Sequence, residues 1–234
     1  MAHGTLAIFS PTNLIGDLTG WTFQNGGGKS ASKDRASELG SDGDELLSAL
    51  HNGKETATLE FVGALTTGNY SFPAVGAHAN GWHIDEIQVK WDRGKIRPKM
   101  TVTVHRHTEG AMHTTCRTYV SSLSGKIAAQ VFGCPSDFDD AFVLTQGAVV
   151  GMRSATLTVR CSHVDEPNGT GGNLMGDNYD GVETLVVELT GAATADDYET
   201  SWDEPDSGDT PSNTGATTHS LNFEHHIAHT VQGS

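Results

Sequence analysis

The sequence predicts an all-β protein, a β-sandwich or barrel of about ten strands, from two kinds of pattern. Apolar and polar side chains alternate over short stretches rich in β-branched residues, as expected for strands that bury one face. Segments rich in Gly and Asn separate these stretches and allow turns with positive φ. The predicted strands are residues 5–9, 19–24, 55–62, 83–91, 99–107, 117–122, 141–145, 154–163, 182–190 and 220–228.

In the first half of the chain, one short helix interrupts the predicted strands, over residues 45–51. The acidic turn Asp42-Gly43-Asp44 precedes this helix, and Asn52-Gly53 follows it as a second turn. Strand 55–62 comes next, with threonines and acidic residues alternating with apolar side chains. We therefore expect a strand, a turn, a short helix and a further strand in this order.

The second half begins with another short helix, predicted over residues 124–132. Residues 155–163 resemble residues 99–107, a similarity that strand composition alone can produce. Residues 192–218 are rich in Asp, Ser, Thr, Gly and Pro, which predicts a long acidic loop or projecting hairpin within a single domain spanning residues 1–234. Aromatic residues in such a loop favour contact with a partner.

The charges are distributed unevenly along the chain. It has 29 acidic and 14 basic residues, and residues 161–234 contain 14 of the acidic residues but no Lys or Arg. A protein that grips nucleic acid needs basic side chains against the phosphates, so this composition disfavours DNA or RNA binding. Two interpretations stay open: a solvated acidic face that favours solubility, and a surface to which a passing polyanion does not adhere.

The three cysteines, Cys116, Cys134 and Cys161, form no closely spaced pair. Neither a disulfide framework nor a cysteine zinc site is indicated, and we expect small core residues in a reducing compartment. No run of about 18 apolar residues occurs, and the first residues lack the pattern of a secretory signal. We expect neither a membrane span nor export.

Histidines supply the weak candidates for a metal site. His105 and His107 stand two apart on one predicted strand and share a face, and His163 lies on the similar strand. Imidazole suits zinc, copper or nickel, but chance proximity competes with this interpretation because the chain has 12 histidines. We predict no cofactor and no metal, with these three histidines as the residues that would form such a site.

Other motifs do not indicate catalysis. Residues 177–183 match a calcium loop poorly, and Asp180-Gly181 is better interpreted as a tight turn that starts the strand at Val182. The sequence has no GxSxG elbow, no HExxH helix and no complete Walker A loop. The prediction is a protein that is not an enzyme.

Four runs of the chain carry a resemblance to a known family: Trp21-Thr22-Phe23-Gln24, Lys33-Asp34-Arg35-Ala36, Asp42-Gly43-Asp44-Glu45 and residues 52–61. They resemble the opening of phage tail tube and related virion structural proteins. In that family a strand leads into a loop, an acidic Asp-Gly turn follows, and a paired strand closes the hairpin. The final strand after a long polar loop, residues 220–227, is also similar. The chain is longer than many tube subunits, which leaves an inserted decoration or a different virion part open.

The resemblance implies a β-sandwich subunit of stacked rings, commonly hexameric, that form a hollow tube for DNA. Its partners would be copies of itself and other tail or virion proteins, with DNA only as passing cargo and no membrane. It would be a virion component assembled in the cytoplasm of a host bacterium. Carboxylates along the lumen would keep DNA from adhering. The expected lumen or surface acidic residues are Asp165, Glu166, Asp177, Asp180 and Glu183, and the expected subunit contacts are Asp42, Asp44, Tyr198 and Trp202.

Two other functions compete with this one. A monomeric β-sandwich binding module, for carbohydrate or another ligand, is suggested by Asn13-Leu14-Ile15 ahead of Gly20-Trp21-Thr22. Its sugar platform would be formed by tryptophans, namely Trp21, Trp82, Trp91 or Trp202. The third function is a metal-dependent enzyme built on the three candidate histidines.

Overall fold

The structure is a computed structural model in which every regular element described is a β-strand. The all-β prediction is therefore confirmed. In the part of the chain that the structure describes, no helix has the length and apolar character needed to cross a membrane. The described residues are 18–26, 30–39, 41, 45–64, 70–79, 81–92, 97–107, 116–122, 124, 143–144, 152–167, 173–190, 198–199, 208–211 and 217–232.

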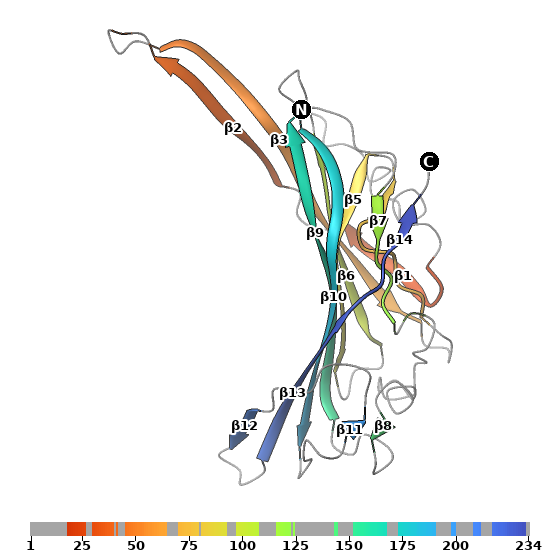
Figure 1. Cartoon of the computed structure of the whole chain (residues 1–234). Coiled ribbons are helices and arrows are strands. Elements are labelled where there is room, and N and C mark those ends of the chain that lie inside the picture. Colours follow the sequence, from red (N-terminus) through yellow and green to blue (C-terminus); the bar gives the residue numbers. More distant parts are fainter. Residues whose placement is uncertain are drawn as a thin grey trace.

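Ten strands form one large antiparallel sheet, which Figure 1 shows as a tall, curved surface. These strands are β1 (Trp21–Gly26), β2 (Ser30–Leu39), β3 (Glu45–Gly63), β4 (His78–Ala79), β5 (Trp82–Asp92), β6 (Lys99–His107), β9 (Met152–Pro167), β10 (Asn173–Thr190), β12 (Gly208–Pro211) and β13 (Thr217–His226). Their order is β1-β3-β6-β5-β9-β10-β13-β12, while β2 pairs with β3 and β4 pairs with β5. Two small sheets join β7 (Cys116–Thr118) to β14 (Thr230–Gln232), and β8 (Val143–Leu144) to β11 (Tyr198–Glu199).

Strand β3 changes partners along its length. Its residues 45–56 pair with β2, whereas residues 54–62 pair with β6 and residues 59–63 with β1. Within the described part of the chain, the first part of β3 therefore pairs only with β2, and together they form a two-stranded ribbon that projects beyond the rest of the sheet (Figure 1). We call residues 34–39 and 45–51 the β2–β3 ribbon.

The prediction of a helix over residues 45–51 was wrong, as was the predicted turn at Asn52-Gly53. Both segments belong to the continuous strand β3. The local sequence favours helix because of its leucines and alanine, but cross-strand pairing with β2 overrides that weak local preference. The second predicted helix lies outside the described residues apart from Ser124, and so does predicted strand 5–9.

The hydrophobic core lies between the central strands and the segment 70–77. One fully buried row crosses the sheet through directly paired residues, one from each of four neighbouring strands. Segment 70–77 contributes Tyr70, Phe72 and Val75 to the same core. Val75 also exchanges backbone hydrogen bonds of 2.9 and 2.8 Å with Tyr119. The row consists of Leu59, Val102, Ile87 and Val159.

Strand β10 runs without interruption through the position of a predicted turn. The prediction that Asp180-Gly181 starts the strand at Val182 was wrong, because pairing with β9 continues on both sides of these residues. The register shifts between Tyr179 and Val182, and Asp180 has a φ of 54°. The two residues therefore form a β-bulge, in which Asp180 adopts a positive φ that Asp tolerates better than most residues.

Part of the predicted loop 192–218 is a strand at the sheet edge. β12 pairs with the beginning of β13, which places this section of the chain at one end of the large sheet. The two similar sequences lie on either side of β5: residues 99–107 coincide with β6, and residues 155–163 lie in β9. Both therefore contribute histidines near the same strand, which is the basis of the site described next.

Candidate functional site

A cluster of histidines lies where β5 and β6 meet, close to β9. The three histidines singled out from the sequence, His105, His107 and His163, come together here. The ring of His105 stacks on that of His163 with centroids 4.9 Å apart, and it lies 5.3 Å from that of His107. The cluster also contains His83 and Asp85, which sequence reasoning missed.

Strand register explains how these side chains meet. His83 on β5 pairs directly with His105 on β6, so their rings lie on the same side of the sheet, with centroids 4.9 Å apart. The register between these strands shifts between Ile84 and Glu86. Asp85 is therefore an extra residue with no cross-strand partner on β6, and a β-bulge of this kind redirects a side chain.

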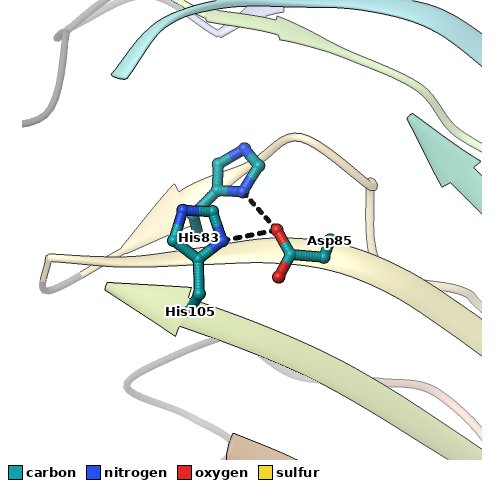
Figure 2. Close-up of side chains that lie close together, drawn as sticks. All are labelled: His83, Asp85 and His105. Carbon is teal, nitrogen blue, oxygen red and sulfur yellow. Dashed lines mark hydrogen bonds and ion pairs between the residues drawn. The ribbon is translucent and has the colours of Figure 1, made fainter. Parts of the chain in front are cut away.

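Asp85 joins the two buried histidines through a single oxygen atom. Its Oδ1 lies 3.0 Å from Nδ1 of His83 and 2.5 Å from Nδ1 of His105. Figure 2 marks both contacts with dashed lines that meet at this oxygen. Both histidines are fully buried, whereas the Asp85 side chain keeps 22% of its surface exposed. The arrangement therefore has a buried interior and one partly open side.

Asn178 on β10 holds His83 from the other side. Its amide group donates hydrogen bonds to the carbonyl oxygens of Gly76 and Arg117, at 3.0 and 2.7 Å. Its carbonyl oxygen lies 3.1 Å from Nε2 of His83. Asn178 thus connects β10, the segment 70–77 and β7 to the histidine cluster.

The environment shifts the protonation of two cluster members. Burial on its own raises the pKa of Asp85, but the neighbouring imidazoles of His105 and His83 outweigh burial and hold this pKa well below its usual range. Burial lowers the pKa of His105, although the hydrogen bond to Asp85 opposes that effect. At neutral pH the site therefore presents a carboxylate beside a neutral His105 imidazole.

Chemically, the cluster offers two imidazoles and a carboxylate to one small volume. Ligand atoms of His83, Asp85 and His105 all lie within 4.8 Å of one another. Such a set can hold a divalent cation or share a proton. His83 and Asp85 stand two residues apart on one predicted strand, which was a usable sequence signal. Their meeting with His105 depends on strand register, which the sequence does not show. For Asn178 the sequence offered no signal.

The predicted lumen or surface acidic residues have different environments. Asp180 is exposed, with its carboxylate 3.3 Å from His226 Nδ1. Asp177 pairs with the Arg117 guanidinium at 3.4 Å and accepts a hydrogen bond from the backbone of Asn178. The backbones of Asp165 and Glu166 lie in β9.

Glu183 does not fit the expected surface position, because its side chain is fully buried. It pairs across the sheet with Val159 and so continues the buried row of the core. Its carboxylate accepts hydrogen bonds from the Ser121 hydroxyl at 2.7 Å and from the Ser122 backbone at 3.1 Å. In this fold Glu183 fixes the segment after β7 rather than lining a surface of the chain.

Of the expected subunit contacts, Tyr198 lies in β11. Trp202, Asp42 and Asp44 lie outside the described residues.

Three of the tryptophans proposed for a sugar platform do not form one. Trp82 and Trp91 are almost completely buried in the core. Trp21 is half-buried, packs on Tyr70 with ring centroids 4.8 Å apart, and donates its indole N–H to the carbonyl oxygen of Ser71. The fourth, Trp202, is not among the described residues. A stacking surface for carbohydrate therefore finds no support from these three side chains.

The chain matches no protein-family model and no curated protein. Its function is therefore inferred from the geometry of the fold and the chemistry of its residues.

Proposed function

We propose that this chain is a structural virion protein that assembles with copies of itself, and that it forms the subunit of a phage tail tube. The observation that carries this proposal is the β2–β3 ribbon. Among the described residues its strands pair only with each other, and it projects beyond the sheet (Figure 1). An isolated two-stranded ribbon is at best marginally stable in water, so we expect a neighbouring subunit to cover it.

The edges of the large sheet support the same proposal. Within the part of the chain that the structure describes, β1 and β12 each have one strand neighbour and stand at opposite ends of the sheet. Open strand edges are sites where another chain adds strands. A contact between one edge and a different surface of the next subunit is heterologous, and such contacts close into rings when their rotation permits.

The location of the acidic residues suggests which side of the subunit faces DNA. The chain from residue 161 onward has no Lys or Arg, and its strands β10, β13 and β12 are neighbours at one side of the sheet. Negative charge without interspersed basic side chains repels the phosphate backbone. We assign the end of the sheet formed by β10, β13 and β12 to the lumen, where its negative charge would allow DNA to slide without adhering.

Self-assembly is the property to measure first. Light scattering and negative-stain electron microscopy of the purified chain across a wide concentration range should show rings or hollow filaments. Monomers of one chain mass at every concentration and salt condition would contradict self-assembly and favour the monomeric binding module.

A shortened ribbon tests the observation that carries the proposal. Replacing residues 33–53 by Asn-Gly joins Ser32 directly to its cross-strand partner Lys54 through a two-residue turn. The variant should keep the β-sheet circular dichroism spectrum and lose ring or filament formation. As a matched control, replacing residues 40–44 by Asn-Gly joins Leu39 to its partner Glu45 and keeps both ribbon strands but removes Asp42 and Asp44. Assembly that persists in this variant assigns the contact to the ribbon strands, and assembly that is lost assigns it to the tip with these two carboxylates.

A further inference from the structure

The hydrogen bonds of Asn178 determine which nitrogen of His83 carries a proton. Because the Asn178 amide donates to the carbonyl oxygens of Gly76 and Arg117, its own oxygen faces Nε2 of His83, at 3.1 Å. An amide oxygen only accepts hydrogen bonds, so Nε2 of His83 is the donor. In a neutral imidazole the other nitrogen, Nδ1, then carries a lone pair.

This lone pair points toward another acceptor. Nδ1 of His83 lies 3.0 Å from Oδ1 of Asp85, and a carboxylate oxygen also only accepts hydrogen bonds. Two acceptors so close together in a buried place repel each other unless His83 takes up a second proton or a cation lies between them. His105 brings its Nδ1 to the same oxygen, at 2.5 Å, so three potential ligand atoms converge.

We propose that His83, Asp85 and His105 bind one divalent transition-metal ion, for which zinc is the best fit. Two imidazole nitrogens and a carboxylate oxygen are a common protein ligand set for zinc, and a three-residue set leaves a fourth coordination position open. The ligand atoms already lie within 4.8 Å of one another. With zinc bonds of about 2.0–2.1 Å, two ligand atoms of one ion lie farther apart than the 2.5 Å between Nδ1 of His105 and Oδ1 of Asp85. Binding therefore moves these two atoms apart.

The surroundings of the ligands fit this assignment. Metal-binding histidines usually donate their second N–H to a neighbouring acceptor, and His83 donates Nε2–H to Asn178. Nε2 of His105 is buried, and no hydrogen-bond partner exists for it among the described residues. Without an ion, the proton of the neutral His105 imidazole therefore lies on Nδ1 and faces Oδ1 of Asp85, and metal binding at Nδ1 shifts this proton to Nε2.

An ion at this position would fasten several parts of the fold together. The ligands join β5 to β6, and Asn178 extends the connection to β10 and to the backbone at Gly76 and Arg117. An ion that binds only the folded chain raises its stability with ion concentration. The metal site does not depend on the proposed assembly, because all three ligands belong to one chain.

Zinc uptake by the untagged full-length chain tests the proposal. After treatment with a chelator and removal of that chelator, calorimetric titration with zinc chloride should show one ion per chain and an unfolding temperature that rises with zinc concentration. Asp85→Asn and His105→Gln should each weaken binding at least about 100-fold, since even residues outside the ligand set contribute 10- to 100-fold.

His226→Gln is the matched control. His226 is exposed and lies 3.3 Å from Asp180 and 4.0 Å from Glu224, so it combines the same residue types at the surface. This variant should bind zinc as the unchanged chain does. No stoichiometric uptake by the unchanged chain would overturn the proposal, as would loss of binding in His226→Gln together with retention in Asp85→Asn.

A measurement on the unchanged chain tests the metal site even if the variants fail to fold. Cobalt(II) in place of zinc should produce visible absorption bands and strongly shifted NMR signals from the exchangeable ring protons of two histidines. If these signals are missing, or if His83 is doubly protonated while cobalt is present, the three residues form a buried ion pair and the metal site does not exist.

Discussion

Gly181 stands directly against the aromatic ring of Tyr119, at the β-bulge of β10. A Cβ atom at this position would lie 2.0 Å from Cδ1 of Tyr119 and 2.3 Å from its Cγ, far inside van der Waals contact. Tyr119 is buried, and its backbone is held by two hydrogen bonds to Val75. The ring therefore has no easy way to move aside, and glycine is required here for space.

Gly181→Ala should lower the free energy of unfolding by about 3 kcal/mol, because overpacking of a tight contact shifts the ring or the bulge. Urea denaturation measures the change. Gly81→Ala serves as the control, since Gly81 has a φ of 79° and no atom lies within 4 Å of the place that a Cβ atom would take, so only backbone strain of about 1 kcal/mol is expected. Equal losses in the two variants would contradict a steric role of Tyr119.

Glu183→Ala should destabilise the fold by about 2–4 kcal/mol. The substitution leaves the Ser121 hydroxyl and the Ser122 backbone N–H without their acceptor in a buried place, and unsatisfied buried donors are costly. Glu188→Ala on the same strand removes an exposed hydrogen bond to Ser154 and should change stability by at most about 0.5 kcal/mol. Thermal unfolding of both variants, followed by circular dichroism, measures the difference. Similar unfolding temperatures would mean that the Glu183 hydrogen bonds contribute little.

The strands could be predicted where the signal is local. The alternation of apolar and polar side chains predicted a strand over residues 99–107, which coincide with β6. Successive side chains of a half-buried strand point to the buried and the exposed face in turn, so the pattern is visible within the strand itself. The segment 45–51 was predicted incorrectly because its strand form depends on pairing with residues 34–39. No pattern within seven residues reveals a partner that lies elsewhere in the chain.

The candidate site shows the same division between local and long-range information. Histidines two apart on one strand are visible in the sequence, so His105 and His107 were singled out. His83 and Asp85 join them only through the pairing of His83 with His105 and the bulge beside it, both of which are properties of register. Glu183 was expected at a lumen or surface because of the resemblance to tail tube proteins, and its pairing with Val159 is again long-range information.

Asn178→Ala should lower the free energy of unfolding by at least about 3 kcal/mol. The change leaves the carbonyl oxygens of Gly76 and Arg117, and the ring of His83, without the hydrogen bonds of a fully buried side chain. Asn222→Ala, at an exposed position on β13, is the control and should stay within about 0.5 kcal/mol of the unchanged chain. Chemical denaturation compares the two, and a small loss in Asn178→Ala would show that water replaces the amide.

Two cysteines should be inert toward thiol reagents in the folded chain. Burial and the nearby Asp85 carboxylate raise the pKa of the Cys161 thiol to about 12, and burial raises the pKa of Cys116. At pH 8 a thiol with a pKa near 12 carries roughly a thousandfold less of the reactive thiolate than an ordinary cysteine. A Cys134→Ser variant should therefore show no fast reaction with a chromogenic disulfide at pH 8 and release two equivalents when denatured. Fast modification of the folded variant would mean that Cys116 or Cys161 is accessible as thiolate.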